Sequence, residues 1–164
     1  MAIATTLKSF LDEHHVQYDV VEHAHSHSSL ESAHQASVPG HQVAKAVVLE
    51  DSKGIVVSVL PSTKRLDLDE VNGSLGRKLK LVPEDELSTL FGDCDLGAVP
   101  ALGNAYGLDV VWDDDLRGAT DIYIEAGDHE HLIHTDGEDF RRLVEGMPHS
   151  VISAEKDRSN WMGR

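Results

Sequence analysis

The sequence predicts a mixed α/β fold, a largely antiparallel mixed sheet or barrel surrounded by helices. Strand-like and helix-like apolar patterns follow one another without the regular alternation that is typical of a doubly wound parallel sheet. The turn sequence Asp-Ser-Lys-Gly at residues 51–54 separates two apolar segments, 43–49 and 55–60, which are rich in β-branched residues. These two segments should therefore form an antiparallel hairpin.

Apolar spacing and capping residues predict the helices. Apolar residues recur at helical spacing after Thr6. Ser28 with Glu31 forms a capping-box pattern, and Pro83 with the acidic residues after it suits the start of a helix. The expected helices span residues 6–15, 28–36, 67–75, 83–91 and 137–144. Further strands are expected at residues 16–21, 108–112, 121–125 and 131–134.

The chain length of 164 residues fits one compact domain, and no shift in composition divides it. We assign residues 1–148 to this domain. Residues 149–164 have little to bury apart from Trp161 and Met162, so we expect them to form a loosely attached C-terminal tail.

Targeting signals and cysteine content indicate the compartment. No segment reaches the roughly eighteen apolar residues of a membrane span, and the first residues lack the apolar core of a signal peptide. The single cysteine, Cys94, cannot form an internal disulfide and agrees with a reducing compartment. We therefore expect a cytoplasmic protein with no membrane partner. Cys94 is either a nucleophile or, as we favour, a small packing residue.

The formal net charge of −15 opposes sequence-independent binding to nucleic acid, which depends on basic contacts to phosphates. DNA is therefore not an expected partner, and any RNA must be engaged locally. One small basic patch is available for that purpose, namely Lys64, Arg65, Arg77, Lys78 and Lys80. The same residues would also be ordinary on a solvated surface.

Lys45 interrupts the apolar segment 43–49, where a charge is out of place. Successive side chains of a strand alternate faces, so Lys45 projects with Val43, Val47 and Leu49, the bulkier set that would be chosen for a core. Either the strand lies at an edge and the lysine reaches water, or Lys45 lies in a cleft that binds an anionic ligand.

A glycine-rich loop at residues 96–107 offers almost no reactive side chain. It contains Gly97, Gly103 and Gly107, with a proline at position 100. Glycine permits unusual backbone dihedrals and proline stiffens the chain, so such a loop can present backbone groups to a ligand. The alternative is a simple connection.

Four short motifs give the chain its resemblance to a known family. In order, they are Glu31-Ser32-Ala33, residues 42–49, Leu66-Asp67-Leu68 and Gly97-Ala98-Val99-Pro100-Ala101-Leu102-Gly103. Together they resemble the YbaK and prolyl-tRNA synthetase-associated editing domain family, over about Leu7 to Leu143. The resemblance implies the fold of that family, and we expect neither a cofactor nor a metal.

The resemblance also implies an activity. Such a protein is a freestanding aminoacyl-tRNA hydrolase, a carboxylic ester hydrolase that acts on the ester between a mischarged amino acid and the terminal adenosine of a tRNA, often a proline tRNA. Family members commonly remove alanine or cysteine, and we rank alanine first. The expected partner is the acceptor end of the mischarged tRNA, met directly or presented by an aminoacyl-tRNA synthetase or an elongation factor.

The family's lysine falls on Lys45, where its charge would meet the phosphate or ribose end of the tRNA and balance negative charge in the transition state. The family's glycine-to-proline loop falls on residues that would bind the aminoacyl moiety through backbone groups, namely Gly97, Ala98, Val99, Pro100 and Ala101. The chain departs from the family at the end of this loop. Ala101 replaces the family's proline, and the proline stands one position earlier.

His129 is the best match to a polar residue that the family often has near the amino acid. It could hydrogen-bond the substrate or orient water, or it could be a solvated turn histidine. Ser28 and Ser29 fall where the family often has threonine or serine near the pocket, and for Ser28 we prefer helix capping. No side chain has an obvious nucleophilic setting, which fits family members in which water attacks with help from the substrate's ribose hydroxyl.

Two rival interpretations stay open. His23, His25 and His27 would face one way in an extended segment and could hold a divalent metal, but no cysteine or regular ligand spacing accompanies them. The chain could also be a non-catalytic module of the same fold that binds a nucleotide or a tRNA end. The negative charge and Ala101 leave room for this alternative, whereas Lys45 favours catalysis.

Overall fold

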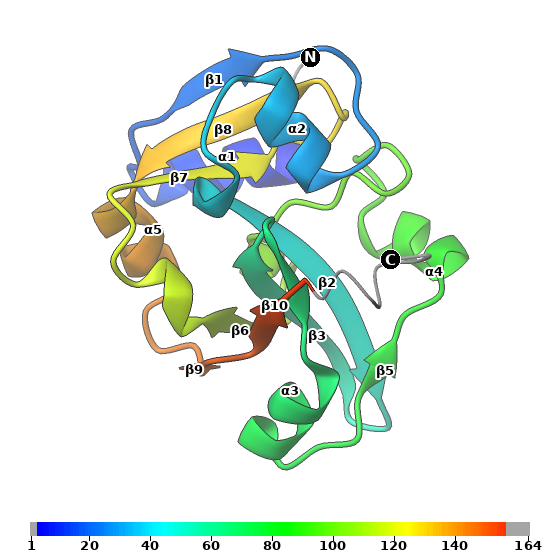
Figure 1. Ribbon diagram of the computed structural model, residues 1–164. Coiled ribbons are helices and arrows are strands. Elements are labelled where there is room, and N and C mark those ends of the chain that lie inside the picture. The colour runs from blue at the N-terminus through cyan, green and yellow to red at the C-terminus, as the bar shows by residue number, and fades with distance from the viewer. Residues whose placement is uncertain (1–2, 157–164) are drawn as a thin grey trace.

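The computed structural model describes residues 3–156 (Figure 1). Within that range, the α-helices are α1 (Thr5–Glu13), α2 (Ser29–Gln35), α3 (Leu68–Leu75), α4 (Glu84–Leu90) and α5 (Gly137–Leu143). The strands are β1 (Asp19–Glu22), β2 (Val43–Asp51), β3 (Gly54–Pro61), β4 (Lys64–Leu66), β5 (Lys80–Leu81), β6 (Asp109–Asp113), β7 (Asp121–Glu125), β8 (His131–Asp136), β9 (His149–Ser150) and β10 (Ser153–Glu155).

The main sheet is mixed. Its strand order is β1-β8-β7-β2-β3-β6-β9, and β5 adds to the far end of β2. Antiparallel pairing joins β1 to β8, β8 to β7, and β2 to both β3 and β5. Parallel pairing joins β7 to β2, β3 to β6, and β6 to β9. A separate two-stranded ribbon pairs β10 with β4. The sequence-based expectation of a mixed, largely antiparallel sheet with surrounding helices is confirmed.

The β2–β3 hairpin forms where the turn sequence predicts it. Its register runs without a break from Ala44 opposite Pro61 to Asp51 opposite Gly54. Asp51 stabilises the turn by accepting a hydrogen bond from the backbone N–H of Lys53 at 2.8 Å. Gly54 has a φ of 134°, a conformation that residues with a side chain rarely adopt.

Two helices, α2 and α3, begin at side-chain caps close to the predicted starts. Ser28 is the N-cap of α2, and its hydroxyl accepts a hydrogen bond from the Glu31 N–H at 3.1 Å. Asp67 caps α3 in the same way through the N–H of Glu70. The predicted strand at 16–21 is correct in type but starts at Asp19, after a turn in which His15 has a left-handed φ of 55°.

The two faces of β2 are buried by different parts of the fold. The main core contains Ala44 and Val48 from one face of β2, together with side chains of α1 and α5. On the other face, Val43 packs in a cluster with α2, and Leu49 packs in a cluster with α3. Lys45 projects on this second face, between the parts covered by α2 and by α3. The predicted alternation along the strand is therefore confirmed.

The C-terminal segment is attached more firmly than expected. β9 pairs with β6, β10 pairs with β4, and Ile152 between them is fully buried. The expectation of a loose tail is therefore wrong for residues 149–155, because one buried apolar side chain and two short ladders hold this segment. Trp161 and Met162 lie outside the described residues.

None of the helices in residues 3–156 has the length and apolar character that crossing a membrane requires.

Candidate active site

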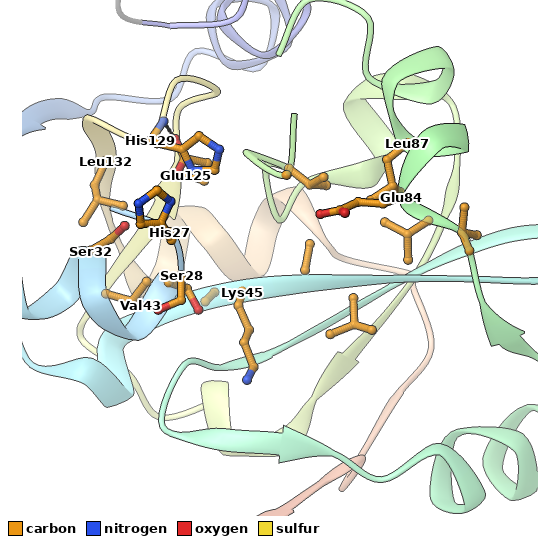
Figure 2. Close-up of a pocket in the computed structure, with 18 of the residues that line it drawn as sticks. His27, Ser28, Ser32, Val43, Lys45, Glu84, Leu87, Glu125, His129 and Leu132 are labelled. Carbon is orange, nitrogen blue, oxygen red and sulfur yellow. Dashed lines mark hydrogen bonds between the residues drawn. The ribbon is translucent and has the colours of Figure 1, made fainter. Parts of the chain in front are cut away.

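A pocket of about 320 Å³ opens beside the middle of β2 (Figure 2). On that edge, β2 pairs with β7 only up to Ala44 and with β5 only from Leu49 onward. The pocket lies in the gap between β7 and β5, beside the part of β2 that pairs with neither strand. Its other walls come from the start of α2, from β5 with the start of α4, from the Gly97 loop and from the turn after β7.

Lys45 lines this pocket and is half-buried. Burial, with a smaller contribution from the charge of Lys156, lowers the pKa of Lys45 from 10.5 to about 8. In Figure 2 its side chain extends from β2 away from His129 and Glu125. No carboxylate within residues 3–156 is among the groups that act on this ammonium. Lys45 is therefore a half-buried lysine of the pocket wall that has no acidic partner among residues 3–156.

The Gly97 loop reaches the pocket through only part of its length. Gly97 and Val99 line the pocket, whereas Ala98, Pro100 and Ala101 are buried in the protein and do not line it. Gly97 has a φ of 81°, and a Cβ atom there would lie 3.7 Å from the ring of His129. On its pocket side the loop therefore presents bare backbone at Gly97 and one apolar residue, Val99.

His129 holds the Gly97 loop in place. Its Nε2 lies 2.7 Å from the Leu96 carbonyl oxygen, and since a carbonyl can only accept, Nε2 carries the proton. The residue itself has a left-handed φ of 64°. The carboxylate of Glu125 stabilises this turn by accepting hydrogen bonds from the N–H groups of Gly127, Asp128 and His129 at 2.9 to 3.2 Å. His129 lines the pocket and also positions the loop opposite.

Serines of the α2 region line the side of the pocket near Val43. Ser28 and Ser29 both contribute, although the Ser28 hydroxyl is already engaged as the helix cap. Ser32 is buried, and its hydroxyl is bonded to that of Ser26 at 2.5 Å. Of these hydroxyls, that of Ser29 has no hydrogen-bond partner within residues 3–156.

The three alternating histidines do not face one way. His23 is buried, and its Nδ1 bonds to the Ala24 carbonyl at 2.7 Å, whereas His25 and His27 are exposed. The ring of His25 lies 5.4 Å from that of His27 and 5.3 Å from that of His129, two residues that line the pocket. The described part of the chain contains no group of three or more histidine, cysteine or acidic side chains placed to hold a metal ion.

Cys94 lies outside the pocket. Burial raises the pKa of its thiol to about 12, and the thiol is bonded to the Tyr106 hydroxyl at 3.4 Å. A thiol with a raised pKa carries very little thiolate at neutral pH, which favours the packing role over the nucleophilic one for Cys94.

The predicted basic patch is partly neutralised. Arg77 forms a two-pronged ion pair with Asp51, which holds the pKa of that carboxyl well below its usual range. Lys64 pairs with Asp115. Of the five residues, Arg65, Lys78 and Lys80 form no ion pair within residues 3–156. Lys80 belongs to β5, whose next residue, Leu81, lines the pocket.

Several pocket residues have no recognisable signal in the sequence. Glu84 and Leu87 reach the pocket from α4, and Glu125 and Leu132 from β7 and β8. Their distant positions become neighbours only through the order of strands in the sheet. The assembled pocket combines a cation, two carboxylates, apolar walls and exposed backbone, but no activated serine or cysteine. These groups suit the binding of a small molecule that has both polar and apolar parts.

Comparisons with known proteins identify the family and agree with the fold. The family model described as "Aminoacyl-tRNA editing domain" matches residues 23–143. A solved structure described as a candidate trans-editing enzyme for prolyl tRNA synthetase superposes with a TM-score of 0.78 and 22% identity, over 92% of this chain and 96% of that chain. The hypothetical protein APE2540 gives a TM-score of 0.79 and 18% identity, over 91% and 99% of the two chains. No curated protein matches the sequence.

Proposed function

The chain belongs to the aminoacyl-tRNA editing domain family, and from this premise we propose that it is a trans-editing deacylase that hydrolyses the ester of a mischarged tRNA. The match confirms the family resemblance of the sequence motifs. One observation carries the proposal. Lys45, the Gly97 loop and His129, which are far apart in the sequence, line the same pocket.

The walls of the pocket favour a small amino acid. Leu87, Val99 and Leu132 provide apolar surface, and a volume of about 320 Å³ is at the lower end of small-molecule sites. Such a space suits an aminoacyl group while the adenosine stays outside. We therefore propose alanine or cysteine as the amino acid, with alanine ranked first. A proline tRNA is the proposed carrier, in keeping with the description of one similar structure.

The Gly97 loop would receive the ester carbonyl. Within residues 3–156 the backbone N–H of Ala98 donates to Asp95, whereas the N–H groups of Gly97 and Val99 have no such partner. These two groups are available to stabilise the oxyanion that forms when water adds to the carbonyl carbon. The ribose oxygen then leaves with a proton, and the products are the free amino acid and an uncharged tRNA end. His129 keeps the loop in position through Leu96.

Lys45 would act at the nucleic-acid end of the substrate. With a pKa of about 8, its amine is still mostly protonated at pH 7, and it lacks an acidic partner in the described residues. Binding to the ribose-phosphate end would supply that partner and balance negative charge in the transition state. Arg65, Lys78 and Lys80 are proposed to add local contacts to the acceptor stem of the tRNA. A synthetase or elongation factor could present the substrate in the cytoplasm.

The test is hydrolysis of a panel of mischarged tRNAs, led by alanyl- and cysteinyl-tRNA with the proline anticodon. Wild type, Lys45→Ala and the control Lys53→Ala, a turn lysine outside the pocket, are compared. We expect Lys45→Ala to lower kcat/KM by at least about 100-fold, as for the loss of one charge-stabilising group. The melting temperature should not fall below that of wild type, because a cleft lysine contributes little packing and its buried charge does not favour folding.

Three results would count against the proposal. If folded wild type binds tRNA ends but releases no amino acid from any ester, the chain is a binding module of this fold. If Lys45→Ala unfolds, Lys45 is structural. Equal activity of Lys45→Ala and Lys53→Ala would show that Lys45 does not belong to the active site.

A further inference from the structure

The edge of β2 that faces the pocket is not covered by a neighbouring strand. On this edge the ladder with β7 stops at Ala44, and the ladder with β5 begins at Leu49. All six residues from 43 to 48 line the pocket, although their side chains alternate between the two faces of the strand. A pocket can contact consecutive residues in this way only at the edge of a strand.

The backbone groups that point into this gap can be identified from their neighbours. The Val43 carbonyl accepts a hydrogen bond from the Ser62 N–H on the β3 side at 2.8 Å. The Val48 carbonyl accepts from the Val82 N–H on the opposite side at 3.0 Å. Backbone groups of successive strand residues point to alternate edges, so those of Ala46 point with those of Val48. The N–H and C=O of Ala46 therefore face the pocket, between the two ladders.

A free carboxylate lies across the pocket from this edge. Figure 2 shows the Glu84 carboxylate extending from α4 toward the centre of the pocket. One of its oxygens lies 4.0 Å from the point where a Cβ atom on Gly97 would stand. Glu84 forms no ion pair within residues 3–156, whereas Glu125, the other pocket carboxylate, already accepts three backbone hydrogen bonds.

A carboxylate and a backbone carbonyl that line the same pocket favour a cation with several N–H donors. We infer that Glu84 and the Ala46 carbonyl bind the α-ammonium of the aminoacyl group, so that the site requires a free amino group. This inference rests on the proposed deacylase function. The aminoacyl group would pair with Ala46 like one residue of an antiparallel strand, with its carbonyl near the Ala46 N–H and the donors of the Gly97 loop. Peptidyl esters, which lack the ammonium, would be rejected.

Helix stabilisation alone does not account for this placement of Glu84. The first turn of α4 contains Glu84, Asp85 and Glu86, and all three can favour the helix N-terminus. Only Glu84 among them lines the pocket, while Glu86 lines a separate hollow near Arg77. Asp85→Asn is therefore a matched control, because it removes the same charge from the same helix turn without touching the pocket.

The experiment compares two esters that differ only at the α position. One is the aminoacyl-tRNA that wild type releases fastest, and the other is its α-hydroxyacyl analogue, made by deamination with nitrous acid. Each rate is divided by the spontaneous rate of the same ester. We expect wild type to favour the aminoacyl ester by about 10- to 100-fold, the range of a charge-assisted hydrogen bond. Glu84→Gln should lose most of this preference, and Asp85→Asn should keep it.

The outcomes separate this inference from the proposed function. If wild type releases neither acyl group, the deacylase function fails. If wild type releases both with equal enhancement, the function stands and the role of Glu84 is overturned. If Glu84→Gln lowers the hydrolysis rates of both esters by the same factor, Glu84 does not recognise the ammonium, and the inference is also overturned. Melting temperatures of Glu84→Gln and Asp85→Asn should agree, since both lose one charge from the same helix turn.

Discussion

The two edges of β2 differ in what they contact. Toward β3 the strand is paired in unbroken register from Ala44 to Asp51. Toward β7 and β5 the same strand is paired only near its ends, and the pocket occupies the interval between them. The paired edge satisfies backbone groups within the fold, while the interrupted edge exposes backbone groups of residues 45–48 to the pocket. The difference is the basis of our proposal that one edge of the strand serves stability and the other serves binding.

The largest difference between the two edges is expected for a pair of proline substitutions, one at Val47 and one at Ala46. The backbone N–H and C=O of Val47 point toward β3. Its carbonyl accepts a hydrogen bond from the Ser58 hydroxyl at 2.5 Å. Val47→Pro removes a ladder donor and forces a ring between paired strands, so we expect a loss of more than about 3 kcal/mol in the free energy of unfolding. Ala46→Pro should fold, because proline is tolerated where the N–H faces away from the sheet. Urea unfolding measures both variants.

Measurements of activity show in addition whether the pocket edge of β2 belongs to the site. Ala46→Pro should lose deacylation, since the proline ring occupies the space that the aminoacyl group needs. If Ala46→Pro is as unstable as Val47→Pro, the pocket edge of β2 is paired after all. A stable and fully active Ala46→Pro would instead remove this edge from the site.

Much of the fold could be predicted because local sequence determines it. The Asp51–Gly54 turn, the cap at Ser28 and the β-branched residues that flank the turn act over a few residues and need no tertiary information. The strands β5, β9 and β10 could not be predicted. Each has only two or three residues, too few for a periodic pattern, and each forms because a partner strand is already in place.

The candidate site was predictable to a different degree at each residue. Lys45 could be found because a charge inside an apolar strand segment conflicts with its neighbours, and Gly97 because glycine and proline mark an unusual loop. Glu84 and Glu125 gave no such signal, since acidic residues are common at helix starts and strand ends. They reach the pocket only because β7 and β5 both pair with β2 on the edge away from β3.

A smaller effect is expected from the loss of Glu125, which stabilises the turn beside the pocket edge of β2. Its carboxylate accepts three backbone hydrogen bonds from the turn that contains His129. Glu125→Ala should lower the free energy of unfolding by about 1 to 3 kcal/mol and reduce deacylation, because the turn that positions the Gly97 loop is released. The control is Glu130→Ala, in the same turn but exposed, with an expected change within about 0.5 kcal/mol. Equal stability of the two variants would show that the turn keeps its conformation without the Glu125 carboxylate.

The smallest effect concerns the charge of Lys45, whose pKa is lowered to about 8 in the folded protein against 10.5 when unfolded. Between these values the unfolded chain binds more protons, so the stability of wild type relative to Lys45→Met should rise as the pH rises from 8 to 10.5. Activity should change in the opposite direction and fall as the pH rises through about 8, because the neutral amine no longer balances the transition-state charge. Lys45→Arg stays charged throughout, so its profile, corrected for spontaneous hydrolysis, should lack this fall. The α-ammonium of the substrate titrates identically with both proteins, so superimposable profiles would mean that the charge at position 45 does not contribute to catalysis.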